Sequence, residues 1–66
     1  MFTKEIKEAG DKMIHSALAA SLLARINGRD ERVSAKLYAS IRIDNKDSEL
    51  LSYVLGSIDE HFGAES

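Results

Sequence analysis

Apolar residues recur at spacings of three and four along most of this chain, which is the period of an α-helix. Two polar breaks, Asn27-Gly28 and residues 44–47, interrupt the pattern, and there is no repeat or low-complexity tract. We therefore expect an all-α chain of three helices in one domain over residues 1–66, with helices at about 3–26, 30–43 and 47–62.

The first segment has clear signals at both ends. Thr3 can cap a helix N-terminus, because its hydroxyl can accept a hydrogen bond from an N–H of the first turn. Asn27 and Gly28 can end the helix, because both tolerate a positive φ. Asn-Gly also suits a two-residue β-hairpin, but residues 17–24 show no alternation of apolar and polar residues. A helix stop is the favoured interpretation.

The middle segment allows two interpretations. As a helix, it begins at an Asp30 cap and carries one apolar stripe, flanked by Tyr38 and made of Val33, Leu37 and Ile41. As a strand, it alternates apolar and polar residues over 35–43. The helix is favoured because the segment is rich in good helix formers and a single strand would have no partner in the chain. The state of residues 40–46, helix end or strand, stays open.

The third segment again has a helical pattern. Asp44 or Asp47 can cap its start, and Gly63 is expected to end it. Gly56 lies inside the segment, where it marks either a close helix contact or a tolerated glycine. One face is apolar, with Leu50, Leu51, Val54, Leu55, Ile58 and Phe62.

The first helix becomes apolar on almost all sides after Met13, and such a helix is normally buried. Two short helices of the same chain cannot cover it completely, and domains of this size often gain stability by association. We expect a homodimeric helical bundle with two first helices packed at its centre, antiparallel in the simplest arrangement. The alternative is that the small residues accept the other helices of the same chain. The expected dimer interface is Gly10, Met13, Ala17, Leu18, Ala20, Ser21 and Ala24.

Composition excludes several classes of protein. The chain has no cysteine, so it forms neither a disulfide scaffold nor a thiolate metal site. Its longest apolar run, Ala17–Ala20, is far shorter than the roughly 20 residues of a membrane span. Six charged residues lie within positions 4–12, where the apolar part of a secretory signal would begin. We therefore expect a cytoplasmic protein that does not enter a membrane.

No residues have the spacing of a catalytic or metal-binding motif. His15 and His61 lie on different segments without partners at metal-ligand spacing. Asp44, Asp47 and Glu49 lack the spacing of a calcium-binding loop. Neither a glycine-rich phosphate loop nor a nucleophile elbow is present. We expect no enzymatic activity, no cofactor and no bound metal.

Binding to another macromolecule is the function that remains, and we expect the partner to be a protein that the chain regulates or inhibits. Arginine and tyrosine are enriched in binding hot spots, and the candidate residues are Arg25, Arg29, Arg32, Lys36, Tyr38 and Arg42. Tyr53 and Phe62 are further aromatic candidates, although the tyrosines equally suit a half-buried core position.

Two alternatives stay open. The first is a DNA-binding regulator that uses its basic second helix, through Arg29, Arg32, Lys36 and Arg42. The net charge of −2 and the four acidic residues without a basic one in residues 48–66 argue against it. The second is a structural subunit of a larger assembly.

Overall fold

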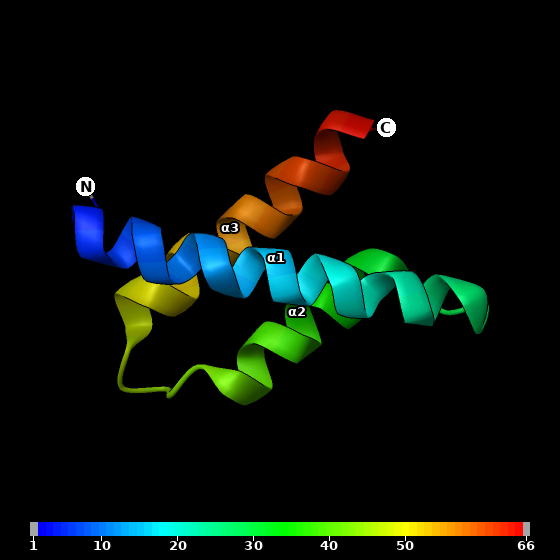
Figure 1. Cartoon of the computed structure of the whole chain (residues 1–66), viewed down its shortest axis with the longest axis horizontal. Helices are drawn as coiled ribbons and strands as arrows, with labels where there is room; N and C mark the ends of the chain where they lie inside the picture. Colours follow the sequence, from blue (N-terminus) through cyan, green and yellow to red (C-terminus); the bar gives the residue numbers. More distant parts are fainter. Residues whose placement is uncertain (1, 66) are drawn as a thin grey trace.

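The computed structural model describes residues 2–65, with side chains up to Gly63, and contains three α-helices and no strand in that range. The helices are α1 (Lys4–Ile26), α2 (Glu31–Arg42) and α3 (Ser48–Glu65) (Figure 1). This confirms the all-helical prediction, including a helical middle segment. α2 ends at Arg42, and Ile43 is extended with φ −92° and ψ 128°.

Side chains and backbone groups near the ends of α1 and α2 define where these helices begin and end. The Thr3 hydroxyl accepts a hydrogen bond from the Ile6 N–H at 3.2 Å, and the Asp30 carboxylate accepts one from the Val33 N–H at 3.0 Å. These contacts satisfy N–H groups that a helix start leaves without partners. The predicted N-caps of α1 and α2 are therefore confirmed, whereas the Asp44 carboxylate accepts a hydrogen bond from the Lys46 N–H at 3.0 Å, in the turn before α3.

A Schellman turn ends α1 at Asn27-Gly28. Gly28 has φ +73°, and its N–H donates to the Arg25 carbonyl at 3.0 Å. The Arg29 N–H donates to the Ala24 carbonyl at 2.8 Å. These two bonds are the signature of this motif, with glycine as the left-handed residue. The turn also fixes the backbone of Arg29 directly beside the last turn of α1.

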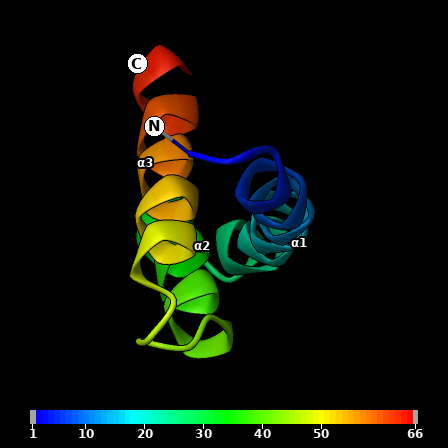
Figure 2. The ribbon, with the colours of Figure 1, turned by 90° about the vertical axis from the view of Figure 1, so that its left-hand side faces the viewer.

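The helices form two layers. α1 alone makes one layer and lies across α2 and α3, which make the other (Figures 1 and 2). Its 23 residues correspond to about 35 Å of helix. The molecule is 35 Å long, so α1 extends over the full length of the molecule. Each helix packs against both of the others.

Small residues form most of the core. Ala17, Ala35 and Ala39 are fully buried with Val54 and Ile58. Ser21 is buried beside them, and its hydroxyl donates to the Leu18 carbonyl at 2.6 Å. Such small side chains allow the helix backbones to approach closely, so the centre of this fold has little room for large residues.

Larger apolar residues pack around that centre from α1 and α3. Of the predicted stripe on the third segment, two residues are fully buried and the others are half-buried against the core. They are Val54 and Ile58, followed by Leu50, Leu51, Leu55 and Phe62.

The expected stripe on α2 faces solvent. Val33, Leu37 and Ile41 are exposed, whereas Ala35 and Ala39 face the core. α2 has an apolar stripe on each of two opposite faces, and close packing against α1 selects the alanine face.

α3 continues beyond the predicted stop at Gly63 and ends at Glu65. Gly28 is the one glycine with a positive φ among the described residues, so Gly63 does not act as a left-handed cap. A Cβ atom at Gly56 or Gly63 would meet nothing within 4 Å, so neither glycine marks a close contact within the chain. No described helix has the length and hydropathy needed to cross a lipid bilayer.

Candidate functional site

Among the described residues, six large hydrophobic side chains are exposed, by 55–79% of their surface. All six belong to the second half of α1 or to α2: Leu22, Leu23, Ile26, Val33, Leu37 and Ile41. Exposed single leucines are ordinary on protein surfaces, but a cluster of this kind on one helical hairpin is typical of an interaction surface. The α1–α2 hairpin is therefore the candidate binding region.

A groove of about 310 Å³ runs between α1 and α2, and we call it the α1–α2 groove. Ala20 and Ala24 line it from α1, and the alanine side chains leave space between the helices. Leu23, Leu37 and Ile41 supply its large apolar side chains. The remaining lining residues are Asn27, Arg29, Ser34, Tyr38 and Arg42.

The charged residues that line the α1–α2 groove are both arginines. Arg29 is placed there by the turn that ends α1, and it has no ion-pair partner among the side chains that the structure describes. The Arg42 guanidinium carbon lies 3.7 Å from the centre of the Tyr38 ring, in a cation–π contact. No aspartate or glutamate with a described side chain lines the groove. The groove is therefore apolar with two cationic side chains at its border.

Two other basic residues of α2 point toward α3. The Arg32 Nε donates to Asp59 Oδ1 at 2.8 Å, and the Lys36 Nζ donates to Asp59 Oδ2 at 3.2 Å. These hydrogen bonds from Arg32 and Lys36 hold the pKa of the Asp59 carboxyl below its ordinary value of 3.8. Arg32 and Lys36 thus connect the two helices, and their charges are partly compensated by Asp59.

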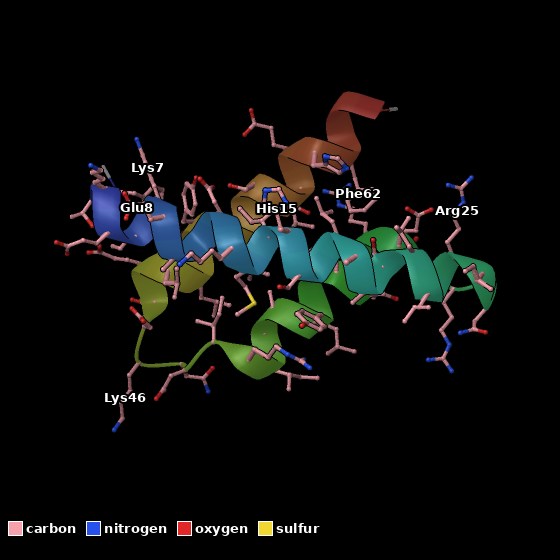
Figure 3. The ribbon with its side chains drawn as sticks, in the orientation of Figure 1. Lys7, Glu8, His15, Arg25, Lys46 and Phe62 are labelled. Carbon is pink, nitrogen blue, oxygen red and sulfur yellow. The ribbon has the colours of Figure 1, made fainter. Side chains whose placement is uncertain are left out.

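The six predicted partner-binding residues divide between three places. The structure brings Arg29, Tyr38 and Arg42 together at the α1–α2 groove, whereas Arg32 and Lys36 hold Asp59. Arg25 forms an ion pair with Glu31, with 3.5 Å between Arg25 Nε and Glu31 Oε1. Its side chain projects away from the bundle near the end of α1 (Figure 3).

The residues expected at a dimer interface lie mostly inside the chain. Gly10, Ala17, Ser21 and Ala24 are buried in contact with the other helices, and Met13, Leu18 and Ala20 are half-buried. At Gly10 the Tyr53 ring lies so close that an added Cβ would be 2.6 Å from its Cε2 atom. The buried small residues on α1 thus pack within the chain, and of the predicted interface Met13, Leu18 and Ala20 remain partly exposed.

A second groove, also of about 310 Å³, lies between α1 and the end of α3. Leu18, Leu22 and Phe62 give it apolar walls, and the Arg25–Glu31 ion pair and His61 give it polar ones. Its charges are mixed, so it has no preference for an anion or a cation. Among the described residues, no group of three histidine, aspartate or glutamate side chains could hold a metal ion.

Sequence reasoning did not identify Leu23, Leu37 and Ile41 as binding residues. The available signal was the presence of two apolar stripes on one short helix, with alanines at 35 and 39 and large residues at 37 and 41. A helix with two such faces can bury one within its chain and leave the other for a partner.

Comparison with models of known protein families, with curated proteins and with solved structures finds no match to this chain.

Proposed function

We propose that this chain is a non-enzymatic homodimeric protein that binds another protein and regulates or inhibits it. One observation carries the proposal. The core is built mainly from small residues, while the six largest exposed hydrophobics gather on α1 and α2 between Leu22 and Ile41. Burial of apolar surface is the main driving force of protein association, and the described residues leave this surface uncovered.

The total accessible surface supports the proposal. The chain exposes 4791 Å², whereas a folded monomer of its mass of 7.3 kDa is expected to expose about 4,200 Å². The excess of about 600 Å² is close to the roughly 800 Å² that each partner contributes to a standard interface. The excess is smaller than the area of one standard contact, so it does not distinguish the homodimer contact from the contact with a second protein.

For the homodimer we propose a contact through the outer side of α1. Leu22 and Ile26 are one helical turn apart and therefore lie side by side on that surface. They are 55% and 79% exposed, and neither lines the α1–α2 groove. A two-fold contact between these residues keeps α1 at the centre of the dimer. It also leaves the α1–α2 groove open for the second protein.

Light-scattering mass measured over a range of protein concentrations tests the dimer. We expect a mass of about twice 7.3 kDa, and Ile26→Asp should reduce it to that of one chain. Val33→Asp is the matched control, because Val33 is also exposed but lies on α2, and it should leave the mass unchanged. A single-chain mass at every concentration would contradict the dimer, and a much larger mass would favour a structural assembly.

A labelled synthetic peptide tests the binding of a second protein. We choose an uncharged amphipathic helix of about eighteen residues with a leucine stripe, because helix-in-groove binding uses such anchors. Fluorescence anisotropy should show saturable binding that Leu37→Asp weakens at least about tenfold. A peptide with the leucines replaced by serine is the control. Equal titrations of both peptides would contradict the proposal.

Random duplex DNA in the same assay tests the DNA-binding alternative. A strongly salt-dependent affinity for the duplex would favour that alternative. We expect no such binding, since Asp59 compensates Arg32 and Lys36, two of the four basic residues that it requires.

A further inference from the structure

We infer that the α1–α2 groove binds an amphipathic helix of a partner protein that carries acidic side chains at both ends of its apolar stripe. The inference rests on the proposed function and adds the chemistry of the partner. It is based on the charge of the groove border, on the spacing of the two arginines and on how each arginine is held.

The charge of the border selects an acidic partner. Leu23, Leu37 and Ile41 provide the apolar contacts, and Arg29 and Arg42 provide the charged groups of the lining. Asp30 is the nearest carboxylate in sequence to Arg29, and its side chain caps α2 by accepting the Val33 N–H. A partner with carboxylates at these positions would pair with both arginines, whereas lysines there would face like charges.

The spacing of the arginines defines the partner further. Arg29 precedes the first residue of α2, and Arg42 is its last residue. The 12 residues of α2 rise about 18 Å, so the backbones of the two arginines lie near opposite ends of α2, with the Arg42 guanidinium turned back over Tyr38. On a bound helix, positions about eleven residues apart lie on the same face after three turns and are separated by a similar distance. Two acidic residues at this spacing, with leucine-like residues between them, match the groove.

The Arg42 side chain is held before any partner binds, and the backbone of Arg29 is fixed. The Schellman turn fixes the backbone of Arg29 beside Ala24, and the Tyr38 ring supports the Arg42 guanidinium at 3.7 Å. A guanidinium stacked on a ring keeps its N–H edge free to bind a carboxylate through two parallel hydrogen bonds. Holding the side chain in advance lowers the entropy cost of forming that contact.

A second copy of this chain does not fit the groove. A two-fold contact uses the same surface on both subunits, so it would bring together four arginines, two from each groove. The acidic helix α3 cannot serve as the occupant either, because its apolar residues Val54 and Ile58 are buried in its own core. A different protein with an acidic helix is therefore the occupant that the charges support.

Three labelled peptides with the same leucine stripe test the inference. They differ at two flanking positions about eleven residues apart, which hold glutamate, glutamine or lysine. At low salt we expect the glutamate peptide to bind about tenfold or more tightly than the lysine peptide. The difference should shrink as salt is raised, because these charges are exposed to solvent.

Charge-reversal variants show whether the groove causes the preference. Combining Arg29→Glu with Arg42→Glu should reverse it in favour of the lysine peptide. Combining Lys7→Glu with Lys46→Glu makes the same change in net charge at residues that do not line the groove (Figure 3), and it should keep the preference for glutamate. Combining Arg29→Gln with Arg42→Gln removes both charges without reversing them and should abolish the preference. This double variant replaces the charge-reversed one if circular dichroism shows that the latter does not fold.

The outcomes separate the inference from the proposed function. Equal binding of the three peptides, or an equal loss of preference in both reversed variants, would overturn the acidic partner and leave groove binding intact. Absence of binding by all three peptides would overturn both the groove as the binding site and the inference.

Discussion

The Tyr53 ring lies against the backbone of Gly10, where α3 crosses α1. An added Cβ at Gly10 would lie 2.6 Å from Tyr53 Cε2 and 3.4 Å from Val54 Cγ2. The Tyr53 hydroxyl donates to Asp11 Oδ1 at 2.8 Å, and the Phe2 ring packs edge-on at 5.1 Å. The hydrogen bond to Asp11 raises the pKa of Tyr53 above its ordinary value of 10.0. The aromatic ring is held on several sides, so it cannot easily move away from a larger residue at position 10.

Gly10→Ala is therefore expected to destabilise the chain by about 1–2 kcal/mol, because overpacking outweighs the gain in helix propensity. Gly56→Ala is the matched control on α3, where a Cβ meets nothing within 4 Å. It should stabilise the chain by about 0.5–1 kcal/mol. Urea unfolding followed by circular dichroism measures both, and a change of the same sign in the two variants would contradict this packing.

Identical substitutions at Ile41 and Ile58 compare the outer surface with the core. Ile58 is fully buried, so Ile58→Ala should cost about 2–5 kcal/mol through lost contacts and the cavity that remains. Ile41 is 70% exposed, so Ile41→Ala should change the free energy of unfolding by no more than about 0.5 kcal/mol. Measurement at low protein concentration keeps association out of the comparison. A large loss at Ile41 in dilute solution would mean that this residue packs within the chain.

Ala17→Leu tests where the small residues of α1 pack. Ala17 is fully buried in the core, so the added side chain should cost about 1–3 kcal/mol. The loss should be independent of protein concentration, because the contacts lie within one chain. The thermal midpoint measured over a wide concentration range checks this. If the destabilisation disappeared on dilution, the small residues would have to pack between copies, as the sequence alone suggested.

Asp59→Asn should remove a pH-dependent part of the stability. Hydrogen bonds from Arg32 and Lys36 lower the folded-state pKa of Asp59 below 3.8, its ordinary value and the one expected in the unfolded chain. Its contribution is then fully present above that value and is lost as the pH falls through the folded pKa. The natural chain should be more stable than Asp59→Asn near neutral pH, and the difference should shrink at acid pH.

Glu60→Gln is the control for this titration, because Glu60 is an exposed carboxylate next to Asp59 on α3. Urea unfolding between about pH 2 and pH 7 compares both variants with the natural chain, and Glu60→Gln shows what loss of a neighbouring surface carboxylate does by itself. A difference for Asp59→Asn that stays constant over this range would exclude the pairing of Asp59 with Arg32 and Lys36.

Local sequence determines the helices of this protein and most of their ends. Thr3 and Asp30 cap helices because their side-chain oxygens reach N–H groups three residues away, and Gly28 ends α1 because it readily takes a positive φ. These effects act within a few residues, so they can be predicted without knowledge of the fold. The end of α3 was harder to predict, because Gly63 can also remain helical.

The tertiary structure decided which apolar residues face inward. α2 carries alanines on one face and Val33, Leu37 and Ile41 on another. The helical period alone does not show which of these two apolar faces is buried. Close approach of three helices buries the alanines, because small side chains allow the backbones to come together. The larger residues are left outside, and together with Arg29 and Arg42 they form a groove that exists only once α1 and α2 are packed.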